Sequence, residues 1–159
     1  MTDTEKPLKK FNEYGISFAY PSDWELTKEV DETNGEIQIN IAAGDSSFWL
    51  ISLYFADISV EELYNHSKKV FQEEYPELDI YEINTELAGT KCLGCDLEFV
   101  CSELINSAYL RLFQTELFTA LILYQGTDQD LKTTLTDLEA ISNSLDCFGS
   151  DYQGYLDII

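Results

Sequence analysis

Basic residues and histidine are scarce in this sequence. It has 9 Lys and Arg against 30 Asp and Glu, a formal net charge of −21, and a single histidine, His66. A field of this sign repels nucleic-acid phosphates and anionic lipid, so we expect no nucleic-acid partner. Any catalytic triad or metal site that needs imidazole would have to use His66. The same field attracts basic partners or cations.

Long apolar runs and targeting signals are also missing. Residues 1–10 contain no apolar segment, so we expect no signal peptide, and no stretch approaches the roughly 18 apolar residues of a membrane helix. We therefore expect a cytoplasmic protein without membrane insertion. A length of 159 residues with 45% hydrophobic content suits one packed domain. We assign a polar leader to 1–10, the domain to 11–146 and a C-terminal tail to 147–159.

Motifs that bind cofactors or metals are few. The chain has no EF-hand loop, no phosphate-binding loop and neither Gly-x-Gly-x-x-Gly nor Gly-x-Ser-x-Gly, so we expect no cofactor. Cys92 and Cys95 form its one C-x-x-C pair, with Cys101 and Cys147 elsewhere, whereas a structural zinc site usually has two such pairs. Alternation places Cys95 with Cys101 on one strand face and Cys92 on the other. We interpret these cysteines as core residues, with metal binding or a redox role as alternatives.

The carboxylates occur in many small groups, such as 31–32, 61–62, 73–77 and 128–130. With so many acids, adjacent pairs are expected by chance, and we interpret them as solvated surface with a weak calcium site as the alternative. His66 lies off the apolar stripe of a predicted helix, which favours an exposed position. No catalytic or metal-ligating residue is assigned, and we expect the protein not to be an enzyme.

Alternating apolar residues predict the first strands. They cover 16–20, 24–30, 36–41 and 48–55, and Asn34-Gly35 marks a tight turn. Segment 48–55 is apolar on both faces, which is typical of a strand that is central or covered on both sides.

The period then changes to that of a helix. Ser59 and Glu62 form a capping box, apolar residues follow at helical spacing, and Pro76 ends the helix. Strand patterns return at 80–87, 95–101, 108–115 and 118–125, and a second helix begins after Gly126. Runs of strands with two separate helices indicate an α+β fold, an antiparallel sheet flanked by helices.

The best candidates for partner binding are apolar residues that exceed what two helices can cover. They lie on the second face of strand 48–55, on the late hairpin and in the tail: Phe48, Leu50, Tyr54, Tyr109, Phe113, Tyr152 and Tyr155. The first five would form a hydrophobic groove rimmed by acid, suited to a basic or amphipathic segment. Tyr152 and Tyr155 of the tail would dock on this groove within the chain or bind a partner. The alternative is that the helices cover these side chains.

Segment 11–24 carries a resemblance. Tyr14-Gly15-Ile16 followed by Pro21-Ser-Asp-Trp24 resembles the opening of the superfamily that joins PsbP-type photosystem proteins with Mog-type Ran-binding proteins. The helix after the central strand, Leu87-Ala-Gly89 and the closing helix also fit, so the resemblance covers about 11–146. From the residues, Gly15 permits an unusual backbone angle, Pro21 stops a strand and Trp24 can cover the end of the core.

This resemblance implies an α/β/α sandwich without a shared active site. Members serve as photosystem subunits, Ran partners, lipoproteins and chaperone-like adaptors, and no targeting segment or lipobox links this chain to the photosystem or lipoprotein members. The sequence thus predicts a non-enzymatic binding module, adaptor or chaperone-like, whose partner is a protein with a basic or amphipathic surface. A structural subunit of a larger complex and a small metal-dependent hydrolase are the alternatives. A homodimer is left open.

Overall fold

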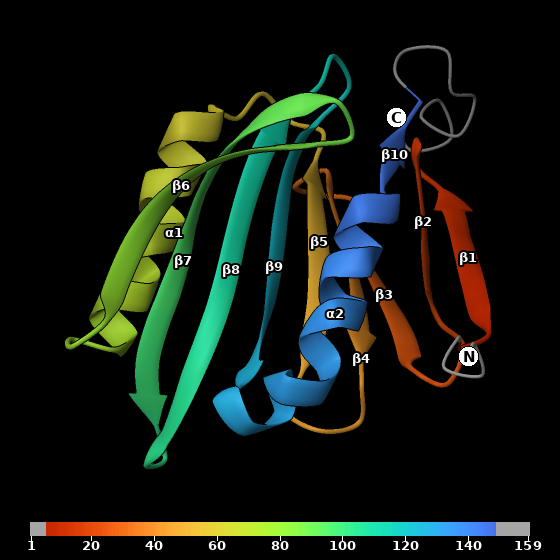
Figure 1. The fold of residues 1–159 in the computed structure, drawn as a ribbon. Coiled ribbons are helices and arrows are strands. Elements are labelled where there is room, and N and C mark those ends of the chain that lie inside the picture. Colours follow the sequence, from red (N-terminus) through yellow and green to blue (C-terminus); the bar gives the residue numbers. More distant parts are fainter. Residues whose placement is uncertain (1–5, 149–159) are drawn as a thin grey trace.

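A computed structural model of the chain describes residues 6–148, which form ten strands and two helices (Figure 1). The strands are β1 (Leu8–Glu13), β2 (Ile16–Pro21), β3 (Glu25–Asp31), β4 (Glu36–Ala42), β5 (Phe48–Tyr54), β6 (Asp79–Leu87), β7 (Thr90–Cys101), β8 (Leu104–Gln114), β9 (Thr119–Thr127) and β10 (Asp146–Cys147). The helices are α1 (Val60–Glu74) and α2 (Asp128–Ser144). Neither has the length and apolar character that crossing a bilayer requires.

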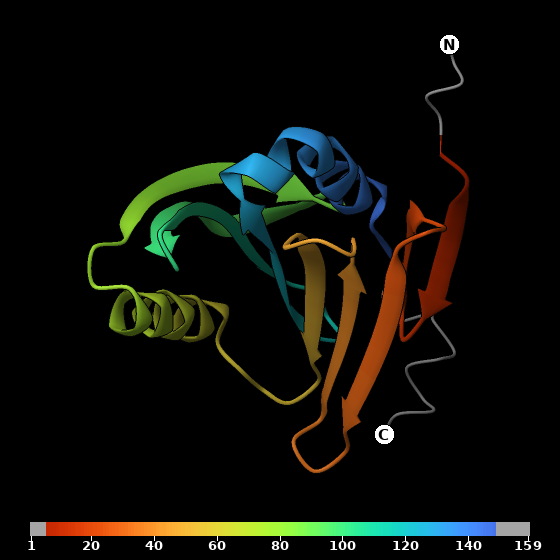
Figure 2. The same cartoon turned by 90° about the horizontal axis from the view of Figure 1, so that it is seen from below.

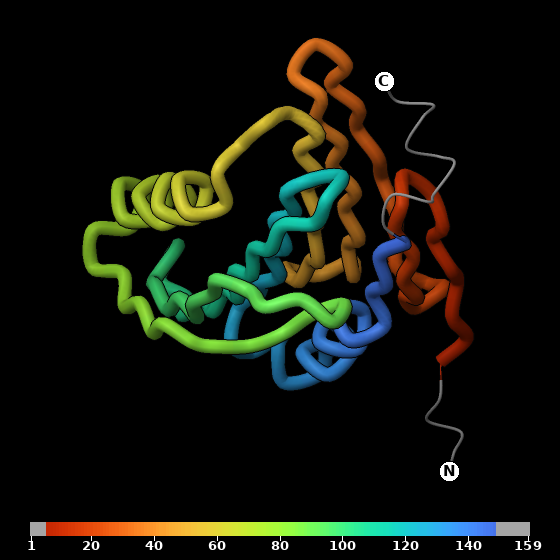
Figure 3. Tube along the Cα trace, turned by 90° about the horizontal axis from the view of Figure 1, so that it is seen from above, coloured from red at the N-terminus to blue at the C-terminus, as the bar shows by residue number. Residues whose placement is uncertain are grey.

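Two antiparallel sheets organise these elements. The larger has seven strands in the order β3-β4-β5-β9-β8-β7-β6, and the smaller has three in the order β1-β2-β10. Figure 2 shows α2 on one face of the large sheet and α1 on the other, and Figure 3 shows the same separation from the opposite side. The predicted α+β fold, a sheet with helices on both faces, is therefore confirmed.

Each helix covers its own apolar core. The α2-side cluster joins α2 and the small sheet to one face of the large sheet, and its largest fully buried side chains include Trp49, Phe18 and Phe113. The α1-side cluster lies on the other face, where Tyr64 of α1 meets buried residues of β7, β8 and β9. Trp24 is buried in the α2-side cluster, as the sequence predicts.

Both helices begin at capped residues. The Ser59 hydroxyl accepts a hydrogen bond from the backbone N–H of Glu62 at 3.2 Å, and α1 ends at Tyr75, directly before Pro76. The Thr127 hydroxyl likewise accepts from the N–H of Asp130 at 3.2 Å. These caps satisfy backbone donors that have no partner inside the helix.

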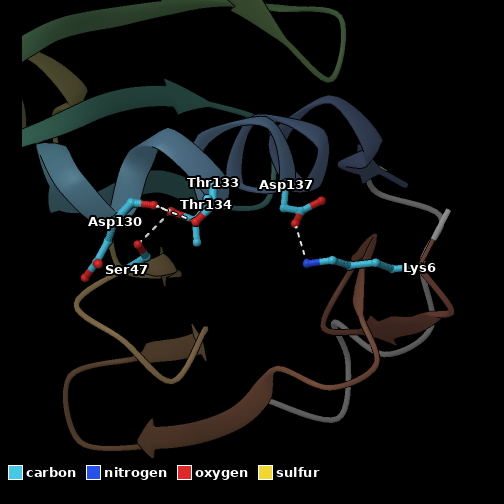
Figure 4. Close-up of polar contacts among 6 residues, drawn as sticks. All are labelled: Lys6, Ser47, Asp130, Thr133, Thr134 and Asp137. Carbon is cyan, nitrogen blue, oxygen red and sulfur yellow. Dashed lines mark hydrogen bonds and ion pairs between the residues drawn. The ribbon is translucent and has the colours of Figure 1, made fainter. Parts of the chain in front are cut away.

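Side-chain contacts fix α2 against the sheets (Figure 4). Thr134 donates to the carbonyl of Asp130 at 3.0 Å, so Ser47 supplies the proton for the 2.7 Å hydrogen bond between the Ser47 and Thr134 hydroxyls. Farther along α2, Lys6 and Asp137 form an ion pair at 2.9 Å. On the buried side, Trp49 Nε1 donates to Ser142 at 2.8 Å. The helix is therefore held to the large sheet at both ends of its length.

The strand bounds differ from the sequence expectation most at β1, β7 and β8, which begins at Leu104 rather than at residue 108. β1 begins at Leu8 and so takes in residues 8–10 of the expected polar leader; only Phe11 of this edge strand is buried, which hides its pattern. β7 begins at Thr90 rather than at residue 95, because Ala88 and Gly89 both adopt positive φ and join β6 to β7 in a tight turn.

Candidate binding surface

The structure divides the predicted binding residues between the two faces of the large sheet. Trp49 pairs with Tyr124 of β9, which pairs with Tyr109 of β8, so Tyr109 lies on the α2 side. Residues directly opposite each other in an antiparallel sheet share a face. Phe48, Leu50 and Tyr54 have the opposite parity to Trp49 and lie on the α1 side. The predicted residues do not form one groove.

The predicted binding role of two of these residues, Phe113 and Tyr109, therefore has to be corrected. Phe113 is 1% exposed in the α2-side cluster, so it has no surface to offer a partner. Tyr109 is half-buried and stacks on Tyr124 with ring centroids 4.9 Å apart. Periodicity along β8 separates its two faces but cannot say which helix each face meets, because that depends on the register with β9. Tyr152 and Tyr155 lie outside the described residues.

The three β5 residues belong to a continuous surface that we call the open face. It consists of the side chains of β3, β4 and β5 that point away from α2. They are Glu25, Thr27, Glu29, Asp31, Glu36, Gln38, Asn40, Ala42, Phe48, Leu50, Ser52 and Tyr54. None of these is Lys or Arg.

Charge and apolar surface lie side by side on the open face. Four cross-strand rows run from the edge strand β3 to β5, and the last pairs Asp31 with Glu36 and Glu36 with Tyr54. Phe48, Leu50 and Tyr54 are half-buried, whereas every open-face residue of β3 is exposed. The pKa of Tyr54 is raised, first by desolvation and then by the Glu36 carboxylate. The apolar side chains of β5 thus share one face with the carboxylates of β3, and the β4 row between them carries one carboxylate, Glu36.

α1 does not extend over this surface. Its main contacts are with β7 and β8, and Figures 2 and 3 show it set apart from β3 and β4. Leu50 and Tyr54 pack at the border of the α1-side cluster. A hollow of about 320 Å³ lies at the far end of β3 and β4, lined by Glu29, Val30, Asp31, Glu36 and Gln38.

The two cysteines of the C-x-x-C pair lie on opposite faces, as alternation predicts. Cys92 joins the α2-side cluster and Cys95 the α1-side cluster, and burial raises the pKa of Cys92 to about 11. Among residues 6–148, no three His, Cys, Asp or Glu side chains are placed to hold a metal ion. Cys101 is exposed at the end of β7, contrary to the expected core position, because alternation continues past the point where the core ends.

The remaining candidates, His66, Asp128 and Asp130, show no arrangement for catalysis or metal binding among the described residues. His66 is exposed on α1, as expected. Asp128 accepts a hydrogen bond from Ser107 at 2.8 Å. Asp130 accepts one from the Ser46 hydroxyl at 2.6 Å, which is the main reason why its pKa is lowered. These two acids therefore fasten the start of α2 to neighbouring segments.

Sequence reasoning missed one group, a buried arginine. Arg111 is 9% exposed; its Nη1 donates to the carbonyls of Cys95 and Leu110 at 3.1 and 3.0 Å, and its Nη2 to Asp96 at 2.9 Å. The Asp96 carboxylate neutralises the guanidinium, and backbone carbonyls of β7 and β8 accept its other hydrogen bonds. Arg111 therefore stabilises the sheet. The only sign of this group in the sequence is an arginine at a position of β8 where the alternation predicts a buried side chain.

A second missed group ties α1 to the edge of the sheet. The Tyr64 hydroxyl lies within hydrogen-bonding distance of the Glu82 carboxylate and of the Gly94 carbonyl. Lys68 donates to the other Glu82 oxygen at 2.9 Å, and its ammonium lies 4.2 Å from the centre of the Tyr64 ring. We call Tyr64, Lys68 and Glu82 the α1 clamp. Its Tyr64–Glu82 contact spans two elements, so local patterns do not show it.

Comparisons with known proteins identify the fold. No protein-family model matches the sequence, and no curated protein does. A protein from Bacteroides thetaiotaomicron superposes with a TM-score of 0.60 at 14% identity; the match covers 91% of this chain but 50% of that one, so this chain spans half its length. The Ran-binding protein Mog1p of Saccharomyces cerevisiae gives 0.57 at 10% identity, with 92% of this chain and 98% of that one covered.

The cyanobacterial PsbP of Synechocystis gives a TM-score of 0.56 at 10% identity, with 93% of this chain and 96% of that chain covered. These matches span nearly the whole of both the yeast and the cyanobacterial proteins. They agree with the resemblance carried by Tyr14-Gly15-Ile16 and by Pro21-Ser-Asp-Trp24. The chain has the fold shared by PsbP-like and Mog-type proteins.

Proposed function

We propose that this protein is a non-enzymatic protein-binding module, adaptor or chaperone-like, and that its open face receives a basic or amphipathic segment of the partner. The arrangement of the open face carries this proposal: the apolar side chains of β5 share this face with Glu36 of β4 and the carboxylates of β3, and no Lys or Arg is present on it. Lys28, the basic residue of β3, belongs to the other face and donates to Glu13 at 3.0 Å. Such complementarity favours specificity and fast association.

Two further observations support it. The yeast protein of the same fold is named a Ran-binding protein, so this architecture can serve protein recognition. The formal net charge of −21 favours a cationic partner over a second copy of this chain, because like charges across an interface are costly. A permanent subunit of a larger complex would use the same surface. An adaptor exchanges its partner with free partner in solution, whereas a permanent subunit does not, so an exchange measurement distinguishes the two roles.

Affinity capture from native lysate at low and high salt tests the proposal. We expect a stoichiometric partner that the wild type retains at low salt and releases at high salt. Leu50→Ser and Glu29→Lys should both lose it, since they remove apolar surface and reverse charge on the open face. Glu139→Lys is the matched control, because it makes the same charge change on α2 at an exposed position.

Equal retention by all four proteins would place the partner elsewhere and reject the open face. If no partner is retained by any of them, the binding role itself fails.

A further inference from the structure

A second apolar surface lies at the end of the hairpin between β7 and β8. Val100 and Ile105 are 63% and 52% exposed there and pair directly with each other, so they share a face of the sheet. Leu104, 54% exposed, pairs with Cys101 and lies on the opposite face. Elsewhere in residues 6–148, the exposed large apolar side chains lie far apart in the sequence: Leu8, Val30, Val70, Tyr81 and Phe148. Single exposed residues need no explanation, whereas a group of them marks an interaction surface. Figure 1 shows this hairpin projecting at the lower end of the sheet.

The backbone holds these residues in place at a cost. Ser102 and Glu103 both have positive φ, 52° and 66°, and Cys101 pairs directly with Leu104. The other two hairpins with such turns have glycine at the second position, Gly15 and Gly89. Side chains in this region of backbone space cost about 1–2 kcal/mol per residue. The turn therefore keeps both strands paired to their ends, which presents the apolar residues on a rigid element.

A hollow of about 460 Å³ adjoins the hairpin. It lies between the end of α1, the start of β6 and the β7–β8 hairpin, and its apolar lining includes Tyr75, Phe99, Val100 and Ile105. Tyr75 stacks on Phe99 with ring centroids 4.1 Å apart, which gives the hollow an aromatic wall. Its size and walls suit one large apolar side chain. We call the hollow together with Val100 and Ile105 the hairpin patch.

The rim of the hollow is negative. Four of its lining residues are acids, Glu74, Glu77, Asp79 and Glu98, and none is Lys or Arg. The hollow also lies at the C-terminal end of α1, whose last turn has no basic residue. A helix C-terminus carries partial negative charge and is stabilised by cations. This helix ends instead in further acids, so an approaching cation meets both the helix end and the carboxylates.

We propose that the hairpin patch is a second docking site, for a partner segment in which Lys or Arg flanks one large apolar side chain. The apolar side chain enters the hollow against Tyr75 and Phe99, and the basic residues pair with the surrounding carboxylates. A second copy of this chain does not suit the patch, because its own surface is acidic. The site is separate from the open face, since β9 and β8 lie between β5 and β7 in the sheet.

Peptide titration of the isotope-labelled full chain tests this proposal. The probe is a short synthetic peptide with one tryptophan between lysines, followed by amide chemical shifts and by fluorescence anisotropy. We expect saturable shifts at Glu74, Val100 and Ile105. Replacing the tryptophan by serine, or the lysines by glutamates, should weaken binding at least about tenfold.

Variants of the protein sharpen the result. Ile105→Ser and Glu77→Lys should each weaken binding about tenfold, because they remove apolar contact and local negative charge at the hollow. Leu8→Ser is the apolar control, since Leu8 is 64% exposed on β1, and Glu139→Lys is the charge control. Both controls should bind like the wild type. All four positions are exposed, so the amide spectrum should confirm that each variant keeps its fold.

Three outcomes would overturn the proposal. Shifts confined to β3, β4 and β5 would favour the open face and leave the hairpin patch without a role. Equal affinity for the serine peptide would mean that charge alone attracts the probe. Absence of saturable binding at low salt would reject the patch while leaving the capture test of the open face unaffected.

Discussion

The two faces of the large sheet are closed in different ways. On the α2 side, a helix and a second sheet cover the strands, and Trp49, Ile39, Ile41 and Ile51 have no measurable exposure. On the α1 side, one helix covers mainly β7 and β8, and Tyr64 is its only buried residue. The first face is closed mainly by apolar packing, with hydrogen bonds from Ser47 and Trp49 to α2, and the second depends more on the charged α1 clamp. We infer that the α2 side supplies most of the stability, and the α1 side the surface for partners.

This comparison predicts the largest loss of stability on the α2 side. Trp24→Ala should lower the free energy of unfolding by about 3–5 kcal/mol, because Trp24 is buried in the α2-side cluster and its removal leaves a cavity. Urea denaturation measures the loss. Tyr81→Ala is the control, an aromatic truncation at a 55% exposed position of β6, and it should cost well under about 1 kcal/mol. Equal losses for the two variants would contradict the comparison.

The α1 clamp should give an intermediate effect. Tyr64→Phe keeps the ring in its cluster and removes only the hydroxyl that reaches Glu82 and the Gly94 carbonyl. We expect a loss of about 0.5–1.5 kcal/mol in the free energy of unfolding, the usual net range for an intramolecular hydrogen bond, because the Glu82 carboxylate is mostly exposed. The pKa of Tyr64 is raised, mainly by burial, so the hydroxyl stays a donor at all ordinary pH values.

Hydrogen exchange provides the local measurement for this variant. Amides of β6 should exchange faster in Tyr64→Phe than in the wild type, because the clamp links this edge strand to α1, while amides of β5 should not change. Tyr81→Phe removes an exposed hydroxyl from β6 and should leave both strands unaffected. Unchanged exchange of β6 in Tyr64→Phe would show that strand pairing with β7 alone holds the edge.

The elements that are marked by capping residues, by proline or by regular alternation can be predicted from the sequence. Ser59 and Pro76 bound α1 because capping and proline act within one or two turns. The two faces of β5 follow from strict alternation, and so do the opposite directions of Cys92 and Cys95. Each of these signals depends only on residues close in the sequence, so it does not change with the tertiary contacts that the segment makes.

The features that depend on remote pairing were not predictable. Phe113 was assigned to a surface because its periodicity fits either face, and only the register of β8 with β9 settles which helix it meets. The β7–β8 turn carries no glycine at Ser102 or Glu103, so no local signal marks it. The candidate surface was therefore predicted in its β5 part alone, and the hairpin patch was missed.

The smallest predicted effect is a pH dependence from the same clamp. The pKa of Glu82 is lowered, first by the Tyr64 hydroxyl and then by Lys68. A carboxyl whose pKa is lower in the folded state adds stability above its unfolded pKa, near 4.5, and loses it as the pH falls through the folded value. The Glu82 side chain is 61% exposed, so solvent screening limits the contribution to below about 1 kcal/mol.

Urea denaturation of the wild type and Glu82→Gln at several pH values measures this effect. The wild type should be the more stable at neutral pH, and its advantage should shrink as the pH falls from about 5 to about 3. Glu86→Gln is the control, because Glu86 lies on the same face of β6 and forms no ion pair with any described residue. An advantage that stays constant with pH would mean that Glu82 acts through packing, and that charge does not help to close the α1 side.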